Sequence, residues 1–427
     1  MFRDFLSPIF YDQFFAHPNK SSIFADMKQE IIDKINRLAS QDEPFLFVIN
    51  YQADEAFIRK LSDINPEECL FDFEGRGNWR ENHSKEMGDS KRIYEEISRE
   101  ISREIPKEIS EKKFFKETPL DSPISWQITP PLYNDYERSF NIVKSNIMAG
   151  NSYLTNLTNR VPVSCNLSLE EIFHRAKGKY KLLLRRKRTQ AEDKAHLKEE
   201  NIEENLTPFV CFSPETFVRI KGGRIYSYPM KGTLDASLPN AEKLLMEDRK
   251  EAAEHATIVD LIRNDLSRVA EDVRVDKYRY VDVLHTNKGD ILQTSSEISG
   301  RLPEDYPHHL GEILDAQLPA GSITGAPKDK TMQIIQEAEG YDRGFYTGIM
   351  GIYDQGELNS AVMIRFIEEE TSPVDFEADG EKNFKANEGK KPKKSRKLYF
   401  KAGGGITSKS DCRREYEEVI QKIYLPF

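Results

Sequence analysis

The chain has few cysteines and no long hydrophobic run. Its four cysteines are too far apart to form a CxxC pair or another metal-ligand pattern: Cys69, Cys165, Cys211 and Cys412. This usage predicts free thiols in a reducing compartment and argues against a disulfide framework or a zinc site. No apolar stretch reaches the ~18 residues that a transmembrane helix needs, and the opening residues 1–5 do not resemble a signal peptide. We therefore expect a cytoplasmic protein without a membrane partner.

The chain also has fewer basic than acidic residues. The chain holds 62 Lys and Arg against 72 Asp and Glu, which gives a formal net charge of −10. Residues 390–397 form a basic run. One short basic patch in an acidic chain is a weak electrostatic footprint for nucleic acid, so we expect no nucleic-acid partner.

Three highly charged segments interrupt an otherwise continuous hydrophobic pattern: 75–117, 184–206 and 368–397. Their low hydrophobicity is typical of flexible segments. We interpret them as loop insertions in a single catalytic domain spanning 1–427, with an N-terminal strand region at 1–74 and a core at 118–427.

The hydrophobic periodicity predicts both strands and long helices. Strand-like segments are 209–228, 279–298, 346–367 and 398–408, and helical ones are 137–149, 240–271, 308–316, 328–339 and 411–424. Strand groups that alternate irregularly with long helices favour an α+β fold over a regular βαβ repeat.

A lysine lies in the pentapeptide Pro229-Met230-Lys231-Gly232-Thr233, directly after a β-branched and aromatic run. Proline fixes φ and glycine tolerates strained backbone angles, so the pentapeptide predicts a turn with Lys231 at the end of a strand. A lysine held there becomes a nucleophile when partial burial lowers its pKa. The alternative is a solvated surface lysine, which is the commoner situation.

Sixteen residues earlier, Glu215 stands in Ser213-Pro214-Glu215-Thr216-Phe217, at the start of the same predicted hairpin. One interpretation is an ordinary strand-entry turn. The other is a general acid facing Lys231 across a pocket, where desolvation raises its pKa towards neutrality.

Two predicted helices each carry a pair of carboxylates at i and i+3. The pairs are Glu251 with Glu254 and Glu415 with Glu418. Like charges at this spacing repel each other, and two such pairs on separate helices can share one Mg²⁺ ion with water and substrate oxygens. In a chain this acidic, the pairs can also be plain solvated helix faces.

Two glycine-rich segments predict backbone amides presented to an anion. Residues 319–328 read PAGSITGAPK, which differs from a phosphate-binding Walker loop in its glycine spacing. Together with Gly403, Gly404 and Gly405, this segment suits a carboxylate ligand. Arg365, after a strand-like run, can add a bidentate contact. Each cluster alone could also be turn chemistry.

These residues belong to eight ordered motifs that resemble the enzymes using chorismate, and more narrowly component I of aminodeoxychorismate synthase. The motifs are SPETF, PMKGT, EHATIVDLIRNDLSRV, PAGSITGAPK, YTGIMGIYD, AVMIRF, KAGGGI and EYEEVIQK, within residues 130–427. The resemblance implies two antiparallel β-sheets packed face to face with helices on the outside. It places the active site between the sheets.

The same resemblance implies a role for each candidate residue. Lys231 matches a lysine whose amine attacks C2 of chorismate while the C4 hydroxyl leaves, after which ammonia adds at C4 and expels the lysine. Glu215 matches the acid that protonates the departing hydroxyl. Glu254 and Glu418 match direct Mg²⁺ ligands, with Glu251 and Glu415 as their water-mediated partners. Positions that hold the two substrate carboxylates are matched by Gly232, Thr233, Tyr346, Arg365, Gly403, Gly404, Gly405 and Lys422.

Two relatives with the same fold remain as alternatives, anthranilate synthase component I and isochorismate synthase. Both usually carry a small residue at the position of Lys231, which argues against them. Residues 293–298 read QTSSEI and lack a histidine that many aromatising relatives have there. A different class of protein, a non-catalytic homologue acting as a binding subunit, would be favoured by loss of Lys231, Glu215 or a metal carboxylate, and all are present.

The four cysteines lie in no G-x-C-x-G elbow and in no plausible Cys/His/Glu set. The chain therefore has no recognisable glutaminase of its own. We expect it to use free ammonia or ammonia from a separate glutaminase subunit.

Overall fold

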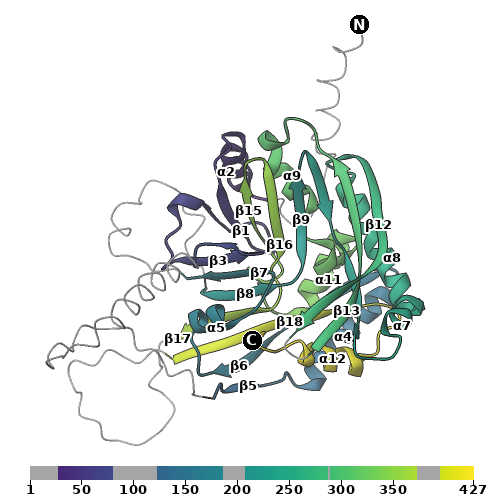
Figure 1. Cartoon of the computed structure of the whole chain (residues 1–427). Coiled ribbons are helices and arrows are strands. Elements are labelled where there is room, and N and C mark those ends of the chain that lie inside the picture. Colours follow the sequence, from purple (N-terminus) through teal and green to yellow (C-terminus); the bar gives the residue numbers. More distant parts are fainter. Residues whose placement is uncertain (1–26, 80–122, 186–206, 287–288, 373–394) are drawn as a thin grey trace, which may run out of the picture.

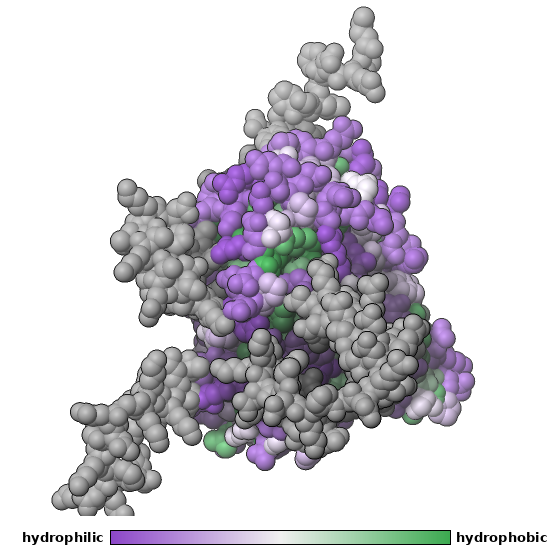
Figure 2. All heavy atoms as spheres, turned by 60° about the vertical axis from the view of Figure 1, so that its left-hand side comes forward, coloured by the Kyte–Doolittle hydropathy of each residue, from purple (hydrophilic) through white to green (hydrophobic). Residues whose placement is uncertain are grey.

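The computed structural model describes residues 27–79, 123–185, 207–286, 289–372 and 395–427. Within these residues, no helix is long and apolar enough to cross a membrane. Where its atoms are coloured, the face turned forward in Figure 2 is mostly hydrophilic, with a hydrophobic patch near its middle.

The first of two antiparallel sheets contains the strand that carries Lys231 (Figure 1). Its strand order is β11 (Met230–Asp235), β13 (Gly289–Arg301), β10 (Arg224–Ser227), β9 (Thr216–Lys221), β16 (Glu357–Val362), β15 (Ile349–Asp354), β1 (Phe45–Ile49) and β2 (Ala56–Lys60). The long strand β12 (Glu271–Thr286) pairs with β13.

The second sheet contains the three consecutive glycines. Its order is β14 (Gly325–Ala326), β6 (Leu154–Cys165), β18 (Ser395–Ile406), β17 (Phe366–Ser372), β8 (Phe209–Ser213), β7 (Tyr180–Leu184), β3 (Cys69–Phe73) and β4 (Arg76–Gly77), with β5 (Trp126–Ile128) pairing with β6. The β18–β6 pairing extends from Leu398 opposite Val163 to Ile406 opposite Thr155.

A sandwich core fills the space between the sheets, with Val48 and Met350 from the first sheet against Phe71 and Leu182 from the second. Two further cores lie on the outer faces. The first sheet is covered by α2 (Gln29–Ser40), α8 (Arg249–Leu266) and α9 (Leu310–Gln317), and the second by α4 (Tyr133–Met148), α5 (Leu169–Arg175), α11 (Lys328–Glu339) and α12 (Cys412–Gln421). The predicted α+β fold of two antiparallel sheets with helices outside is therefore confirmed.

The helix predicted over 240–271 is divided in two. α7 (Ala241–Glu247) ends at Asp248, whose backbone is extended, and α8 begins directly after it. The Asp248 side chain accepts a hydrogen bond from the Glu251 backbone N–H at 3.0 Å, so it caps the new helix. The end of the predicted segment is wrong as well, because the chain enters β12 at Glu271.

The turn predicted at Pro229 is also wrong. β10 and β11 pair one after the other with the same strand, Ser227 opposite Ile298 and Met230 opposite Ser295, so the chain continues in one direction. The backbone N–H of Ser296 donates to the Pro229 carbonyl at 3.0 Å. Proline thus interrupts a strand here without reversing it.

The predicted charged insertions are too long, because strands occupy residues at their ends. Residues 76–77 form β4, and β17 and β18 extend through 368–372 and 395–397. These charged residues stay in strands because they pair across the sheet: Glu368 binds Arg160 at 2.5 Å and Lys401 at 2.7 Å. The remainder of the insertions, 80–117, 186–206 and 373–394, lies outside the described residues.

Candidate active site

Lys231 is the second residue of β11, opposite Thr294 of β13. A β-bulge follows at Gly232, which has φ +75°, a conformation that glycine adopts without strain. The Lys231 Nζ atom lies 3.4 Å from Glu254 Oε2 of α8, with the lysine side chain 28% exposed. It also lies 3.6 Å from the point where a Cβ on Gly405 would stand, so it reaches from one sheet to the glycines of the other.

The first turns of α8 pack against the bulge in β11. A Cβ on Gly232 would stand 3.3 Å from Glu251 Oε2, so glycine leaves room there for the carboxylate. Glu251 and Glu254 are thus brought to the lysine side of the site, as their i, i+3 spacing predicted.

The second carboxylate pair meets the glycine strand from α12. A Cβ on Gly404 would stand 3.6 Å from Glu415 Oε2 and 3.8 Å from Glu418 Oε1. The Lys422 amine binds Glu418 Oε1 at 2.7 Å and donates to the Gly403 carbonyl at 3.0 Å. Burial lowers the pKa of Lys422, and the Glu418 carboxylate opposes that shift.

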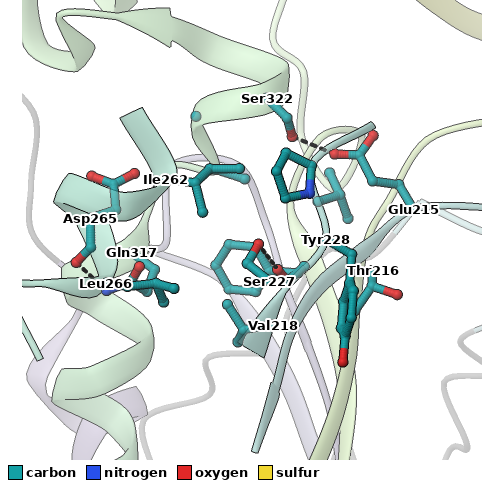
Figure 3. A pocket seen from close by; sticks show the side chains of 15 residues that line it. Glu215, Thr216, Val218, Ser227, Tyr228, Ile262, Asp265, Leu266, Gln317 and Ser322 are labelled. Carbon is teal, nitrogen blue, oxygen red and sulfur yellow. Dashed lines mark hydrogen bonds between the residues drawn. The ribbon is translucent and has the colours of Figure 1, made fainter. Parts of the chain in front are cut away.

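Glu215 lies directly before β9, in the short link that joins β8 of the second sheet to β9 of the first. Burial raises the pKa of this carboxyl, while a hydrogen bond from Ser322 and the charges of Arg365 and Lys231 act in the opposite direction. Ser322 Oγ donates to Glu215 Oε1 at 2.5 Å (Figure 3). Sequence reasoning missed Ser322 as an individual residue, although it lies in the PAGSITGAPK motif.

Arg365 joins β16 to β17 with φ +58°, a left-handed conformation that is uncommon outside glycine. Its charge influences the pKa of Glu215, Lys422 and the buried Tyr346, so these groups share one electrostatic environment. Arg365 and Tyr346 thus lie close to each other, and Arg365 lies close to Glu215 and Lys422. Thr233, in contrast to the buried Tyr346, is exposed; it follows the bulge and pairs with Gln293.

His255 is a second residue that sequence reasoning left unassigned. It is completely buried, with Nε2 2.6 Å from Ser296 Oγ on β13. Burial lowers its pKa to about 4, so the ring is neutral at neutral pH. A neutral ring suits a packing contact that holds α8 on the sheet beside Glu254.

The carboxylates at this site suit a hard divalent cation that takes its other ligands from water and substrate. Among the described residues, no three His, Cys, Asp or Glu side chains gather into a ready-made metal cluster. Mg²⁺ uses one or two carboxylates and takes its other oxygens from water and substrate. Glu254, next to Lys231, and Glu418, next to Gly404, flank the glycine strand and could supply that number.

A cavity adjoins the carboxyl of Glu215 on the side of α8 (Figure 3). It is lined by residues of β9, β10, α8, α9 and α10 (Gly321–Thr324) and by Glu215 directly before β9. Its polar lining residues include Glu215, Thr216, Ser227, Asp265, Gln317 and Ser322. The lining of this cavity therefore combines apolar side chains with a few polar groups, as the lining of small-molecule binding sites does.

Comparison with known proteins gives consistent matches along the chain. A family model described as chorismate binding enzyme matches residues 11–380. An uncharacterized PabA-like protein of Haemophilus influenzae is 40% identical over 93% of this chain and 97% of its own length. Anthranilate synthase component 1 of Aquifex aeolicus is 35% identical over 49% of this chain and 38% of its own length.

Two solved structures share the fold at low identity. A putative 2,3-dihydroxybenzoate-specific isochorismate synthase of Bacillus anthracis has a TM-score of 0.58 and 18% identity, and covers 92% of this chain and 86% of its own. Anthranilate synthase component I of Streptococcus pneumoniae has a TM-score of 0.55 and 19% identity, covering 99% and 85%.

Proposed function

The chain belongs to the chorismate binding enzyme family, and from that premise we propose that it is an aminodeoxychorismate synthase. It converts chorismate and ammonia to 4-amino-4-deoxychorismate, a precursor of para-aminobenzoate and folate. The observation that carries this proposal is the position of Lys231: its amine lies 3.4 Å from Glu254 and faces the glycine strand of the opposite sheet.

Lys231 acts as the nucleophile. Its unprotonated amine forms a bond to C2 of chorismate, the ring double bonds shift, and the C4–O bond breaks. Ammonia then forms a bond to C4, the double bonds return, and the C2–N bond breaks to release the lysine. Splitting one substitution into two steps in this way is ordinary covalent catalysis.

Glu215 supplies the proton that lets the C4 hydroxyl leave as water. Its burial supports this role, because a carboxyl with a raised pKa keeps its proton closer to neutral pH than an exposed one does. Ser322 holds one oxygen of that carboxyl.

The substrate is a dianion, and the site offers matched positive groups. Arg365 and Lys422 bind its carboxylates together with the amides of Gly403, Gly404 and Gly405, while Tyr346 lines the wall. Glu254 and Glu418 would hold Mg²⁺ directly, and Glu251 and Glu415 would hold it through water; the ion would supply a further positive charge for one substrate carboxylate.

We further propose that a separate glutaminase subunit delivers the ammonia. The PabA-like name of the Haemophilus influenzae relative supports a place in the same pathway. The absence of a glutaminase motif around the four cysteines supports a second chain.

The test is to look for the covalent step directly. The purified protein is mixed with Mg²⁺ and chorismate without ammonia, quenched with acid, digested and mapped by mass spectrometry. A peptide containing Lys231 with the added mass of chorismate minus water is expected. An unmodified Lys231 peptide in a preparation that consumes chorismate would contradict the nucleophile.

A further inference from the structure

We propose that Ser322 is a positioning residue for Glu215, and that a buried ion pair behind it keeps it in place. The inference deepens the proposed function and rests on it, because it concerns the acid of that reaction. The ion pair joins Asp265, in the last turn of α8, to Lys328, at the start of α11.

The contact between Ser322 and Glu215 orients the acid. Ser322 Oγ donates to Oε1 at 2.5 Å, and a protonated carboxyl that keeps this hydrogen bond carries its hydrogen on Oε2. General acid catalysis depends on this geometry, because a proton must lie within hydrogen-bond reach of the atom that receives it.

The segment that carries Ser322 is pressed against α8. Ser322 is the second residue of α10 (Gly321–Thr324), which is too short to be stable by itself. A Cβ on Gly321 would stand 2.7 Å from Leu261 Cδ2 and 3.6 Å from Asp265 Oδ2. The segment therefore takes its position from the helix.

The ion pair ties both ends of this segment to the last turn of α8. Lys328 Nζ lies 2.7 Å from Asp265 Oδ2, with side chains 11% and 13% exposed. Lys328 also donates to the Gln317 carbonyl at 2.9 Å, and Gln317 Nε2 donates to the Asp265 carbonyl at 2.9 Å. Figure 3 shows Asp265 and Gln317 at one end of the cavity and the Ser322–Glu215 contact at the other.

Helix α8 thereby contributes to the positions of both the proposed nucleophile and the proposed acid. Glu254, near the start of α8, contacts the nucleophile, and Asp265, near its end, binds Lys328 at the end of the segment that carries Ser322. These two positions are separated by about 16 Å of helix at ~1.5 Å per residue. A rigid helix of this kind keeps the nucleophile and the acid in constant relative position, which oriented catalysis requires.

The experiment measures the titration of the Glu215 carboxyl by ¹³C NMR of glutamate-labelled protein, with Glu215→Gln to assign the resonance. Ser322→Ala removes a hydrogen bond to the charged form, so the titration midpoint is expected to move to higher pH. The other charged and titratable groups near this carboxyl, Arg365, Lys231, Tyr228 and Asp265, are unchanged by that substitution.

The kinetic expectation for Ser322→Ala is a kcat about tenfold lower with KM changed less than about twofold, since the acid is displaced while substrate contacts remain. Ser322→Thr keeps the hydroxyl and is expected to restore both the midpoint and kcat. A Ser322→Ala protein with an unmoved midpoint would overturn the inference, because a merely structural role would not move it.

The ion pair is tested with Lys328→Met and with a matched control on the same helix, Lys330→Met. Lys330 is exposed, and its amine binds the side chain of Gln333. Lys328→Met is expected to shift the Glu215 midpoint in the same direction as Ser322→Ala, and Lys330→Met to leave it in place. If Lys328→Met does not fold, Asp265→Asn combined with Lys328→Gln removes both charges together and provides the same measurement. An unmoved midpoint in the folded variant would overturn the part assigned to the pair.

The NMR titration requires no turnover. If the wild-type protein makes no aminated product, the proposed function fails while the Ser322 inference is still decided by the midpoint. If the product forms and the midpoint does not respond, the inference alone fails.

Discussion

Lys231 and Glu254 form an ion pair between strand β11 and helix α8, with Nζ 3.4 Å from Oε2 and both side chains largely buried. The pair joins the proposed nucleophile to a proposed metal ligand. If Glu254 holds Mg²⁺, its carboxylate would attract the neighbouring lysine less strongly.

The first prediction concerns the nucleophile. Lys231→Ala is expected to lower kcat by about 10³-fold or more, because a side chain that acts by forming a bond cannot be replaced by its neighbours. Binding of Mg²⁺ with chorismate, followed by calorimetry, and the thermal unfolding midpoint should both persist. Lys243→Ala, at a lysine 71% exposed on α7, is the control and should keep full activity. Full activity in Lys231→Ala would remove the assignment.

The second prediction concerns the carboxylates on α8 and α12. Glu254→Gln or Glu418→Gln should weaken metal binding by more than the ~10–100-fold expected for their water-mediated partners Glu251 and Glu415. Mn²⁺ binding, followed by electron paramagnetic resonance in the presence of chorismate, measures this without turnover. Glu247→Gln, 66% exposed on α7, is the control. Equal affinity in all five variants would place the metal elsewhere.

The third prediction concerns pH. The pKa of Glu215 is raised by burial, and a general acid must be protonated. Activity that depends on it is therefore present at pH values below its pKa and is lost as pH rises through that value. Glu215→Gln should lower kcat by ~10²–10⁴-fold and abolish this alkaline limb. A pH–rate profile of kcat measures both, and a limb that survives in Glu215→Gln would belong to another group.

The fourth prediction concerns stability. Arg343 and Glu339 form an ion pair at 2.6 Å with side chains only 1% exposed, and Glu339 also accepts from the Thr158 backbone at 2.8 Å. Glu339→Gln is expected to lower the free energy of unfolding by ~3–5 kcal/mol, because it leaves a buried guanidinium without its counter-charge. Urea denaturation provides the measurement.

A matched control for this pair lies on α8. Asp260 and Arg263 form an exposed pair at 2.8 Å, and Asp260→Asn is expected to cost at most ~1 kcal/mol. Similar losses in the two variants would show that burial does not govern the strength of these pairs.

The sequence predicted the parts of the site that depend on local spacing. The two carboxylate pairs appear on one face of a helix because i and i+3 positions do so in any helix. The placement of Glu215 at the start of a hairpin followed from the strand pattern on both sides. These features require no knowledge of distant contacts.

The features that the sequence did not predict depend on non-local contacts. Ser322 reaches Glu215 across 107 residues of chain, and no periodicity indicates that contact. The strand continuation past Pro229 depends on pairing with β13, which supplies the donor to its carbonyl. The charged end of β17 resembled an insertion because the stabilising partner of Glu368 and Glu370, Arg160, lies on β6.

The most direct test of the account is the identity of the product made from chorismate, Mg²⁺ and ammonium by the purified chain, resolved by liquid chromatography and mass spectrometry. The account predicts a species with the mass of aminodeoxychorismate, in which the pyruvyl group is retained and one nitrogen is gained. Formation of anthranilate or isochorismate as the main product would contradict it.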